Sequence, residues 1–156
     1  MLVSRLDKLD QEVFNHVFKL NPRQAVMLGL HDYDGLLPDV SPGGLKAWTD
    51  KAVGLRDRVR SESHGLDKDG RLDALCLETM LERMLFDVED LRGYATRSNL
   101  YSMQLSVTPY ISREYAPIDA RIGAVNKHLG RVPGFLDQAS RNLDKTFGAA
   151  DCRCCF

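Results

Sequence analysis

Apolar residues recur at steps of three and four along most of the chain, which is the spacing of one face of an α-helix. In the first predicted helix, residues 4–20, these positions are Leu6, Leu9, Val13, Val17 and Leu20. Asn21-Pro22 ends this helix, because proline lacks the amide hydrogen that a helix needs and disfavours helix at the preceding residue. A short helix is predicted over 22–30 and a loop over 31–41, where glycine and proline interrupt the pattern.

Two longer helices are predicted after this loop. Ser41 followed by Pro42 is a typical helix start, with serine as the N-cap and proline in the first turn, so a helix is predicted over 42–62. The next helix, over 69–96, has the widest apolar band of the chain. This band consists of Leu72, Leu75, Cys76, Met80, Leu81, Met84, Leu85, Val88 and Leu91. Its width predicts a helix that is buried on more than one side.

The helical rhythm changes in the last third of the chain. Residues 97–116 lose it and contain three tyrosines, so a loop with one short helix is predicted there. Pro117 begins a further helix, Gly130 ends it, and a last helix follows. No segment alternates with period two over the length of a strand. The predicted fold is all-α, an antiparallel bundle of about six helices with Trp48 and Leu81 in its core.

Composition and charge narrow the function classes. The chain has 156 residues, of which 44% are hydrophobic and 28% are charged, as is typical of one globular domain. Its formal net charge of −1 gives no overall field that would attract nucleic acid or an anionic membrane. The apolar runs are too short to span a membrane, and charges near the N-terminus interrupt any signal-peptide core, so we expect a cytoplasmic protein.

The last residues of the chain differ in composition from the rest. Cys152, Cys154 and Cys155 crowd together there, whereas the cysteines of a disulfide framework are spread along a chain. A soft-metal site would have only these three thiols, and a lipidation signal would not fit the C-a-a-X pattern. We therefore divide the chain into a helical region, 1–146, and an atypical cysteine-rich tail, 147–156, which we interpret as non-native or frame-shifted sequence.

One acidic segment superficially resembles a calcium loop. It begins at Asp67, but Arg71 and Leu72 occupy the positions at which an EF-hand needs an oxygen ligand and a glycine. We therefore expect Asp67 or Asp69 to cap the helix that follows rather than to bind a metal ion.

The four histidines are isolated from one another, so no pair of zinc ligands at helical spacing can be drawn. His16 lies beside the apolar face of the first helix. His64 and His128 lie near predicted helix ends, where an imidazole interacts favourably with the terminal carbonyls. We expect structural roles for these three, and neither a metal nor a cofactor site in this chain.

The densest group of polar side chains is His31, Asp32, Tyr33 and Asp34. At the mouth of a cleft, these residues would offer a proton carrier, two carboxylates and a phenol for acid–base chemistry. Alternatively, both aspartates form turns and caps while His31 and Tyr33 pack between helices. The residues alone favour the structural role, and this group is the candidate site.

Two stretches contain long, spaced motifs. Residues 21–42 contain an Asn-Pro pair, a Gly-x-His-x-Tyr-Asp element and a Leu-Pro-Asp-x-Ser element, formed by Asn21, Pro22, Gly29, His31, Tyr33, Asp34, Leu37, Pro38, Asp39 and Ser41. Residues 112–143 contain Arg-x-Tyr-x-Pro, Leu-x-x-x-Pro and Ala-x-x-Asn-Leu elements. In this order the motifs resemble those of the domain-of-unknown-function 885 family, and the resemblance covers roughly residues 4–145.

The resemblance implies a bacterial protein related to zinc metallopeptidases of the gluzincin type, largely helical and several-fold longer than this chain. The metal motif of such relatives, of the H-E-x-x-P-G-H-H kind, lies downstream of the region seen here. No residue of this sequence matches a zinc ligand or the general base of that motif. The resemblance thus implies a truncated N-terminal helical region that walls a substrate cleft and is catalytically inert alone, with zinc implied only for the full-length relatives.

Two hypotheses follow, and they differ in the expected partner. As a fragment of a larger hydrolase-like, mostly helical protein, the chain should bind its missing C-terminal half or self-associate through an exposed apolar face. As a stand-alone helical binding module, it should contact a partner through the polar loop at 31–39 and the tyrosine-rich loop at 97–116. Neither hypothesis involves nucleic acid or a membrane span.

Overall fold

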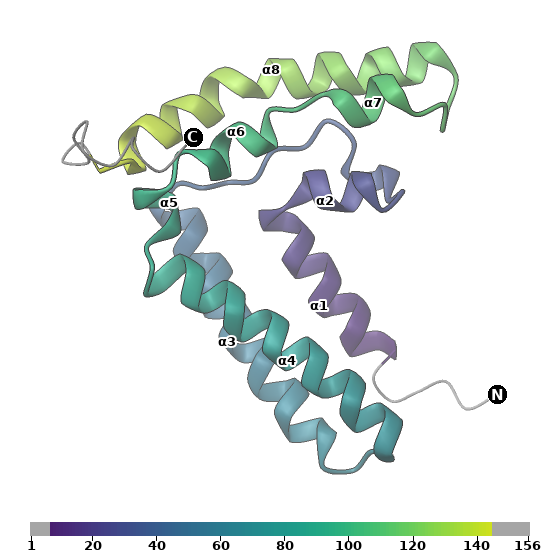
Figure 1. Cartoon of the computed structure of the whole chain (residues 1–156), viewed down its shortest axis with the longest axis vertical. Coiled ribbons are helices and arrows are strands. Elements are labelled where there is room, and N and C mark those ends of the chain that lie inside the picture. Colours follow the sequence, from purple (N-terminus) through teal and green to yellow (C-terminus); the bar gives the residue numbers. More distant parts are fainter. Residues whose placement is uncertain (1–6, 145–156) are drawn as a thin grey trace, which may run out of the picture.

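The computed structural model describes residues 7–144, and every regular element in this part of the chain is helical (Figure 1). The long helices are α1 (Asp7–Leu20), α3 (Pro42–Ser63), α4 (Lys68–Glu89) and α8 (Ile118–Asn142). The short ones are α2 (Pro22–Met27), the 3₁₀ turn η1 (His31–Tyr33), α5 (Gly93–Thr96), α6 (Asn99–Gln104) and α7 (Thr108–Ser112). The predicted all-α fold is confirmed. None of the described helices is both long and apolar enough to cross a membrane.

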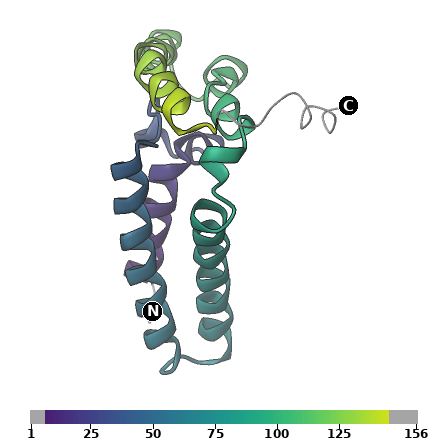
Figure 2. The ribbon, with the colours of Figure 1, turned by 90° about the vertical axis from the view of Figure 1, so that its left-hand side faces the viewer.

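The helices form two groups. α3 and α4 run antiparallel to each other, and α1 lies beside them (Figures 1 and 2). α8 lies across one end of this group, and α5, α6 and α7 follow its inner side (Figure 1). The predicted antiparallel bundle therefore describes α1, α3 and α4, while α8 crosses its end.

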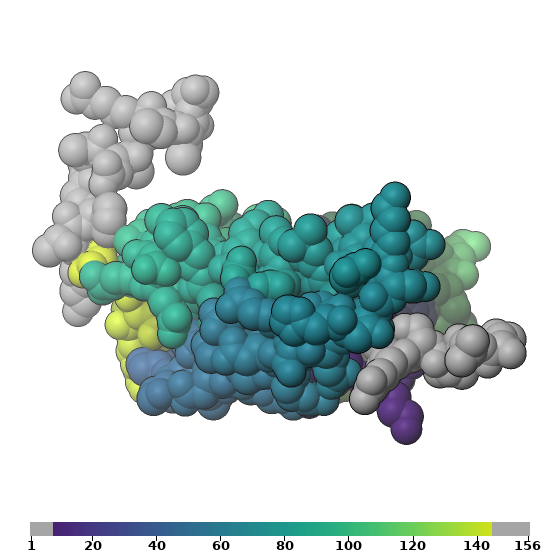
Figure 3. All heavy atoms as spheres, turned by 90° about the horizontal axis from the view of Figure 1, so that it is seen from below, coloured from purple at the N-terminus to yellow at the C-terminus, as the bar shows by residue number. Residues whose placement is uncertain are grey.

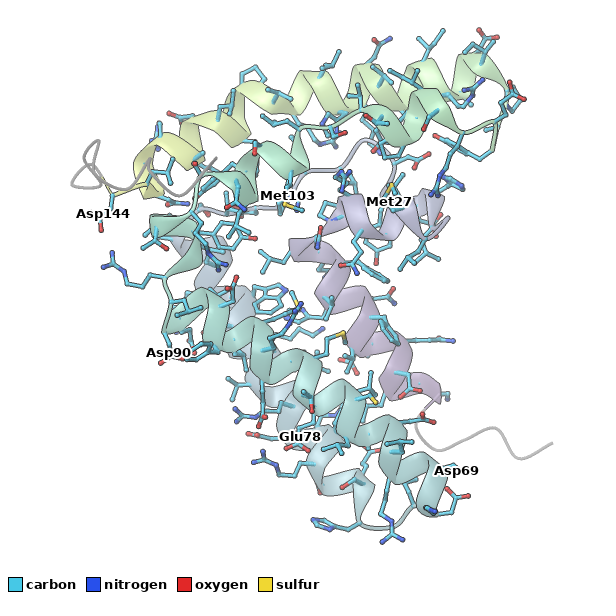
Figure 4. All side chains as sticks on the ribbon, viewed as in Figure 1. Met27, Asp69, Glu78, Asp90, Met103 and Asp144 are labelled. Carbon is cyan, nitrogen blue, oxygen red and sulfur yellow. The ribbon has the colours of Figure 1, made fainter. Side chains whose placement is uncertain are left out.

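The N-terminal caps of α3 and α4 are those expected from the sequence. Ser41 Oγ accepts a hydrogen bond of 3.1 Å, and Asp67 Oδ1 one of 2.9 Å, each from the amide three residues further on. Asp67 thus caps a helix, as the sequence predicted. Further along the two helices, Arg60 of α3 forms an ion pair with Glu78 of α4, which Figure 4 labels.

The fourth predicted helix, 69–96, is interrupted. α4 ends at Glu89, and Arg92 has a left-handed backbone with a φ of 48°. Gly93 follows in a tight position, where a Cβ atom would lie 2.9 Å from the carbonyl oxygen of Asp87. α5 is therefore a separate turn. The apolar spacing continues across this break, which is why the sequence pattern predicted a single helix over both segments.

α8 is a single helix where two were predicted. It runs through Gly130 and Pro133 without interruption. Gly130 lacks the positive φ with which a glycine commonly ends a helix, and Pro133 removes only one amide from the ladder. One face stays buried along the helix, through Ala124, His128, Phe135 and Ala139. His128, expected near a helix end, is therefore buried in the middle of a helix.

Two shorter segments also differ from prediction. α2 ends at Met27 rather than at residue 30, because Gly29 takes a φ of 88° and reverses the chain. The segment 97–116 contains α6 and α7, two short helices rather than one. Pro109 lies in the first turn of α7, where its missing amide costs no hydrogen bond.

The main core lies between α1, α3 and α4. Trp48 and Leu81 are 5% and 0% exposed, as predicted. The apolar band on α4 is only partly covered: Ala74, Leu77, Leu81 and Leu85 are buried, whereas Leu72, Leu75 and Cys76 are exposed. α3 and α4, in blue and teal, make up most of the face shown in Figure 3. The prediction that this helix is buried on more than one side is therefore wrong for its first half.

Candidate functional site

The predicted polar cluster lies on the turn between α2 and α3. The amides of Gly29 and Leu30 close the end of α2 with hydrogen bonds of 3.0 Å to the carbonyls of Val26 and Ala25. η1 follows immediately and carries the first three residues of the cluster. This turn brings the cluster beside the segment that joins α7 to α8, about eighty positions further along the chain.

Three side chains form a closed contact triangle, which we call the His31–Asp34–Tyr115 triangle. The rings of His31 and Tyr115 stack with centroids 3.8 Å apart and an interplanar angle of 5°. The Tyr115 hydroxyl donates a hydrogen bond of 2.8 Å to Asp34 Oδ2. Asp34 Oδ1 lies 3.3 Å from His31 Nδ1. The carboxylate thus joins both rings of the stacked pair.

The Asp34 carboxylate lies within hydrogen-bond distance of both other members of the triangle. Burial, followed by the hydrogen bond to Asp34, raises the pKa of Tyr115 to about 12, so its phenol remains a donor at neutral pH. A carboxylate can only accept, so its contact with His31 favours the imidazole tautomer with hydrogen on Nδ1. In that tautomer, Nε2 is the ring atom available as an acceptor.

Backbone contacts hold the triangle in place. The amide of Gly35, directly after Asp34, donates a 2.9 Å hydrogen bond to the hydroxyl of Tyr110. Gly35 has a φ of 70°, and a Cβ atom there would lie 2.8 Å from the carbonyl oxygen of Ala124. Arg121 donates to the carbonyls of Tyr110 and Ala116, which fixes the segment that carries Tyr115. The site therefore depends on close backbone packing against α8.

Only two of the four residues of the predicted cluster come together in the structure. His31 and Asp34 belong to the triangle, whereas Asp32 is exposed and takes no part in it. Tyr33 turns towards α1: its hydroxyl donates to Asn15 Oδ1 at 3.1 Å, and its ring meets Phe18 edge-on at 5.7 Å. Sequence reasoning did not assign Tyr115 to this site. The tyrosine-rich loop was the signal that could have found it.

The triangle can accept or hold a proton at His31 Nε2 and can orient a polar group that approaches from solvent. The His31 side chain is 39% exposed and that of Asp34 is 18% exposed, so only the imidazole is readily accessible. The arrangement is therefore an accessible imidazole whose ring is held by the stacked Tyr115 and by the Asp34 carboxylate. No group of three histidine, cysteine or carboxylate side chains that could hold a metal ion occurs within residues 7–144.

The other histidines lie elsewhere. His16 and His128 are buried, and His64 is exposed at the end of α3. Burial lowers the pKa of both His16 and His128, which keeps these imidazoles neutral near pH 7. The cysteines of the predicted tail lie outside the residues that the structure describes.

Comparison with protein families gave one result. The model of a family described as "Bacterial protein of unknown function (DUF885)" matches residues 22–151, which is most of the chain. The match includes all three residues of the triangle. Searches of curated proteins and of solved structures gave no match.

Proposed function

Because the chain belongs to the DUF885 family of bacterial proteins, we propose that it forms the N-terminal helical wall of a larger zinc-peptidase-like protein. In this proposal the wall borders a substrate cleft and has no catalytic activity of its own. The zinc ligands and the general base belong to the remaining part of such a protein, where the family resemblance locates the His-Glu-rich motif.

An uncovered apolar stripe on α8 carries the proposal. Its members follow one another at steps of four and three, which is the spacing of a helix–helix seam. They are Ile118, Ile122, Val125, Leu129, Val132 and Leu136, and we call them the α8 stripe. Four of them are 44–57% exposed, while the two valines are half-buried. The four exposed members lie away from the buried face of α8, whereas Val125 packs against the cluster of Val26, Tyr110 and Ala124.

The α8 stripe has the dimensions of an interface between helices. It extends over about 27 Å at a rise of about 1.5 Å per residue. Soluble monomers rarely leave a continuous apolar surface of this length in water, and larger patches usually mark a contact with another protein or domain. Covering the stripe with the remaining part of a larger protein would remove this surface from water.

The position of the triangle supports the same proposal. The segment between α2 and α3, which carries His31 and Asp34, lies at the end of the α1–α3–α4 group that faces α7 and α8 (Figure 1). An imidazole supported by a carboxylate on a cleft wall would contact a polar group of a bound peptide. In this role His31 orients substrate, and the metal-bearing part carries out hydrolysis.

The test combines sequence and activity. The nucleotide sequence downstream of codon 156 is read in all three frames for an H-E-x-x-P-G-H-H motif, and the continuous protein is then expressed. We expect the continuous protein to hydrolyse peptides with zinc and the 156-residue chain to hydrolyse none. Metal-dependent peptide hydrolysis by the short chain, retained after all three tail cysteines are changed to serine, would contradict the proposal.

A stand-alone helical binding module is the second candidate function. It is favoured by the contact between the two loops that such a module would use, because Tyr115 stacks on His31 and Tyr110 binds Gly35. The two loops thus form one surface. A chain that remains monomeric and binds no hydrophobic dye would favour this second function, because its apolar residues would then need no cover.

A further inference from the structure

A pocket opens between α1, α3 and the segment that joins α2 to α3, and none of the three residues of the His31–Asp34–Tyr115 triangle lines it. It has a volume of about 450 Å³, enough for a small organic group. Its apolar lining comes mainly from Phe18, Leu20, Leu37 and Trp48. Three of these four side chains belong to the buried core, so the pocket extends from the surface to the core.

His16 and Trp48 form a rigid unit in the wall of this pocket. Their rings stack with centroids 5.0 Å apart and an interplanar angle of 12°. The Trp48 indole donates a 3.0 Å hydrogen bond to the carbonyl of His16, and His16 Nε2 lies 2.8 Å from the carbonyl of Trp48. Two reciprocal bonds thus fix both rings before any ligand binds.

These bonds leave one nitrogen of His16 without a partner. Because a carbonyl oxygen can only accept, Nε2 must carry the hydrogen, and Nδ1 is therefore an acceptor. The residue is 4% exposed, and Nδ1 has no hydrogen-bond partner. Buried polar atoms of this kind are uncommon. Nδ1 has an accessible area below 1 Å², so an N–H donor could satisfy it only after the side chains that cover it shift.

The charges that line the pocket are mainly positive. Lys19 of α1 and Lys51 of α3 both line it. Both ammonium groups lie close enough to His16 to add to the effect of burial in lowering its pKa. Asp39 also lines the pocket, but its Oδ1 accepts a 3.0 Å hydrogen bond from the amide of Ser41. Lys51 has an ion-pair partner in Glu12 at 3.6 Å, with both side chains well exposed.

We propose that this pocket binds the C-terminal residue of a peptide whose last side chain is apolar. The side chain fills the apolar lining beside Trp48, and the carboxylate lies between Lys19 and Lys51. A shift of the side chains that cover His16 Nδ1 opens it to the pocket, and the amide N–H of the same residue donates to it. A terminal residue with a free carboxylate, an amide N–H and an apolar group within one short unit matches all three features of the lining.

The proposal deepens the proposed function by giving a substrate class, and rests on it only for the claim that the bound peptide is a substrate. Binding itself needs neither zinc nor another part of a larger protein. A failure to bind would therefore leave the α8 stripe and its test unaffected. A failure of the α8 test would equally leave the binding measurement valid.

Fluorescence of Trp48 measures occupancy directly, because it is the single tryptophan of the chain. The probes are N-acetyl-leucine, N-acetyl-leucinamide, which lacks the carboxylate, and 4-methylpentanoate, which lacks the amide N–H. We expect N-acetyl-leucine to bind about tenfold more tightly than the amide, since a bond to a charged group is stronger than one to a neutral group. We expect 4-methylpentanoate to bind several-fold more weakly than N-acetyl-leucine.

The variants Lys19→Met and Lys51→Met test the source of the preference for a carboxylate. Both lysines are exposed, so the substitutions should leave the helices intact, as circular dichroism would verify. Lys46→Met is the matched control, because Lys46 is an exposed lysine of α3 that does not line the pocket. We expect both pocket variants to reduce the preference for acid over amide and the control to keep it.

Three results would overturn the proposal. The first is equal affinity for N-acetyl-leucine and its amide. The second is a preference for the carboxylate that persists in both pocket variants, because the lysines would then play no part. The third is equal affinity for N-acetyl-leucine and 4-methylpentanoate, which would make the pocket a general site for apolar carboxylates, such as free fatty acids, rather than for peptide ends.

Discussion

At the residue scale, the candidate site depends on a tyrosine contributed from a distant part of the chain. Tyr115 uses its ring to cover one face of His31 and its hydroxyl to bind Asp34. Because its pKa is raised to about 12, the hydroxyl keeps its proton over the physiological range. Tyr115 therefore positions the imidazole and the carboxylate relative to each other.

Replacing Tyr115 with phenylalanine keeps the ring stack and removes the hydrogen bond to Asp34. We expect Tyr115→Phe to lower the free energy of unfolding by about 1–2 kcal/mol, because it removes one of the two donors of a partly buried carboxylate. Tyr33→Phe, which removes the hydroxyl that donates to Asn15, is the control and should cost less. Urea unfolding measures both, and equal costs would contradict the role given to Tyr115.

The folded chain should become less stable as the pH is lowered, because two histidines are buried. In the folded chain burial lowers the pKa of His16 and His128 below the ordinary value of 6.5, which the unfolded chain regains. As the pH falls below 6.5, the unfolded state takes up protons that the folded state does not, so the stability present at higher pH is lost. We expect the urea midpoint to decrease from about pH 7.5 to about pH 5.5. The control variant His64→Asn replaces an exposed histidine and should show the same pH dependence of the urea midpoint. A midpoint that stays constant with pH would contradict the expectation.

The sequence predicted two of the three residues of the triangle. His31 and Asp34 stand close together in a dense polar segment, so their grouping is visible in the chain itself. Tyr115 lies 81 positions from Asp34, and helical periodicity gives no information about which distant loops meet. Adjacency in sequence also placed Tyr33 in the cluster, although packing against Phe18 turns it towards α1.

At the element scale, helix spacing predicted where helices lie better than which faces they bury. The limits of α3 agree with prediction to within a residue, because Ser41 and Pro42 mark its start. The face of α4 was misjudged, since apolar residues occur on two sides and neighbouring helices cover only one. The predicted end at Gly130 was wrong because burial of α8 outweighs its weak helix formers.

Two leucines on the same helix test which face of α4 is buried. Leu81 is 0% exposed and Leu72 is 60% exposed. We expect Leu81→Ala to lower the free energy of unfolding by about 2–5 kcal/mol, because it leaves a cavity in the core. The same substitution at Leu72 should cost less than about 1 kcal/mol, since it opens no cavity. Thermal or urea unfolding compares them, and similar costs would mean that the buried face is misassigned.

At the scale of the whole molecule, the chain covers one face of α8 and leaves another uncovered. α5 and α7 contact the helix from one side (Figure 1). The exposed members of the α8 stripe lie outside this contact. Exposed apolar side chains also occur at Met27 and Met103, which Figure 4 labels. Large exposed apolar patches often mark a contact with another protein or domain. That another protein surface covers these residues is the central claim of the proposed function.

The most direct measurement of this claim is the association state of the purified chain, followed by sedimentation velocity and by titration with a hydrophobic dye. We expect the unchanged chain to self-associate and to bind the dye. The double variant Ile122→Gln, Leu129→Gln should be monomeric and bind little dye, because it places two polar groups in the centre of the α8 stripe. Leu72→Gln changes an equally exposed leucine on α4 and should behave like the unchanged chain. A monomeric, dye-silent unchanged chain would contradict the claim, and so would association that the double variant leaves unaltered.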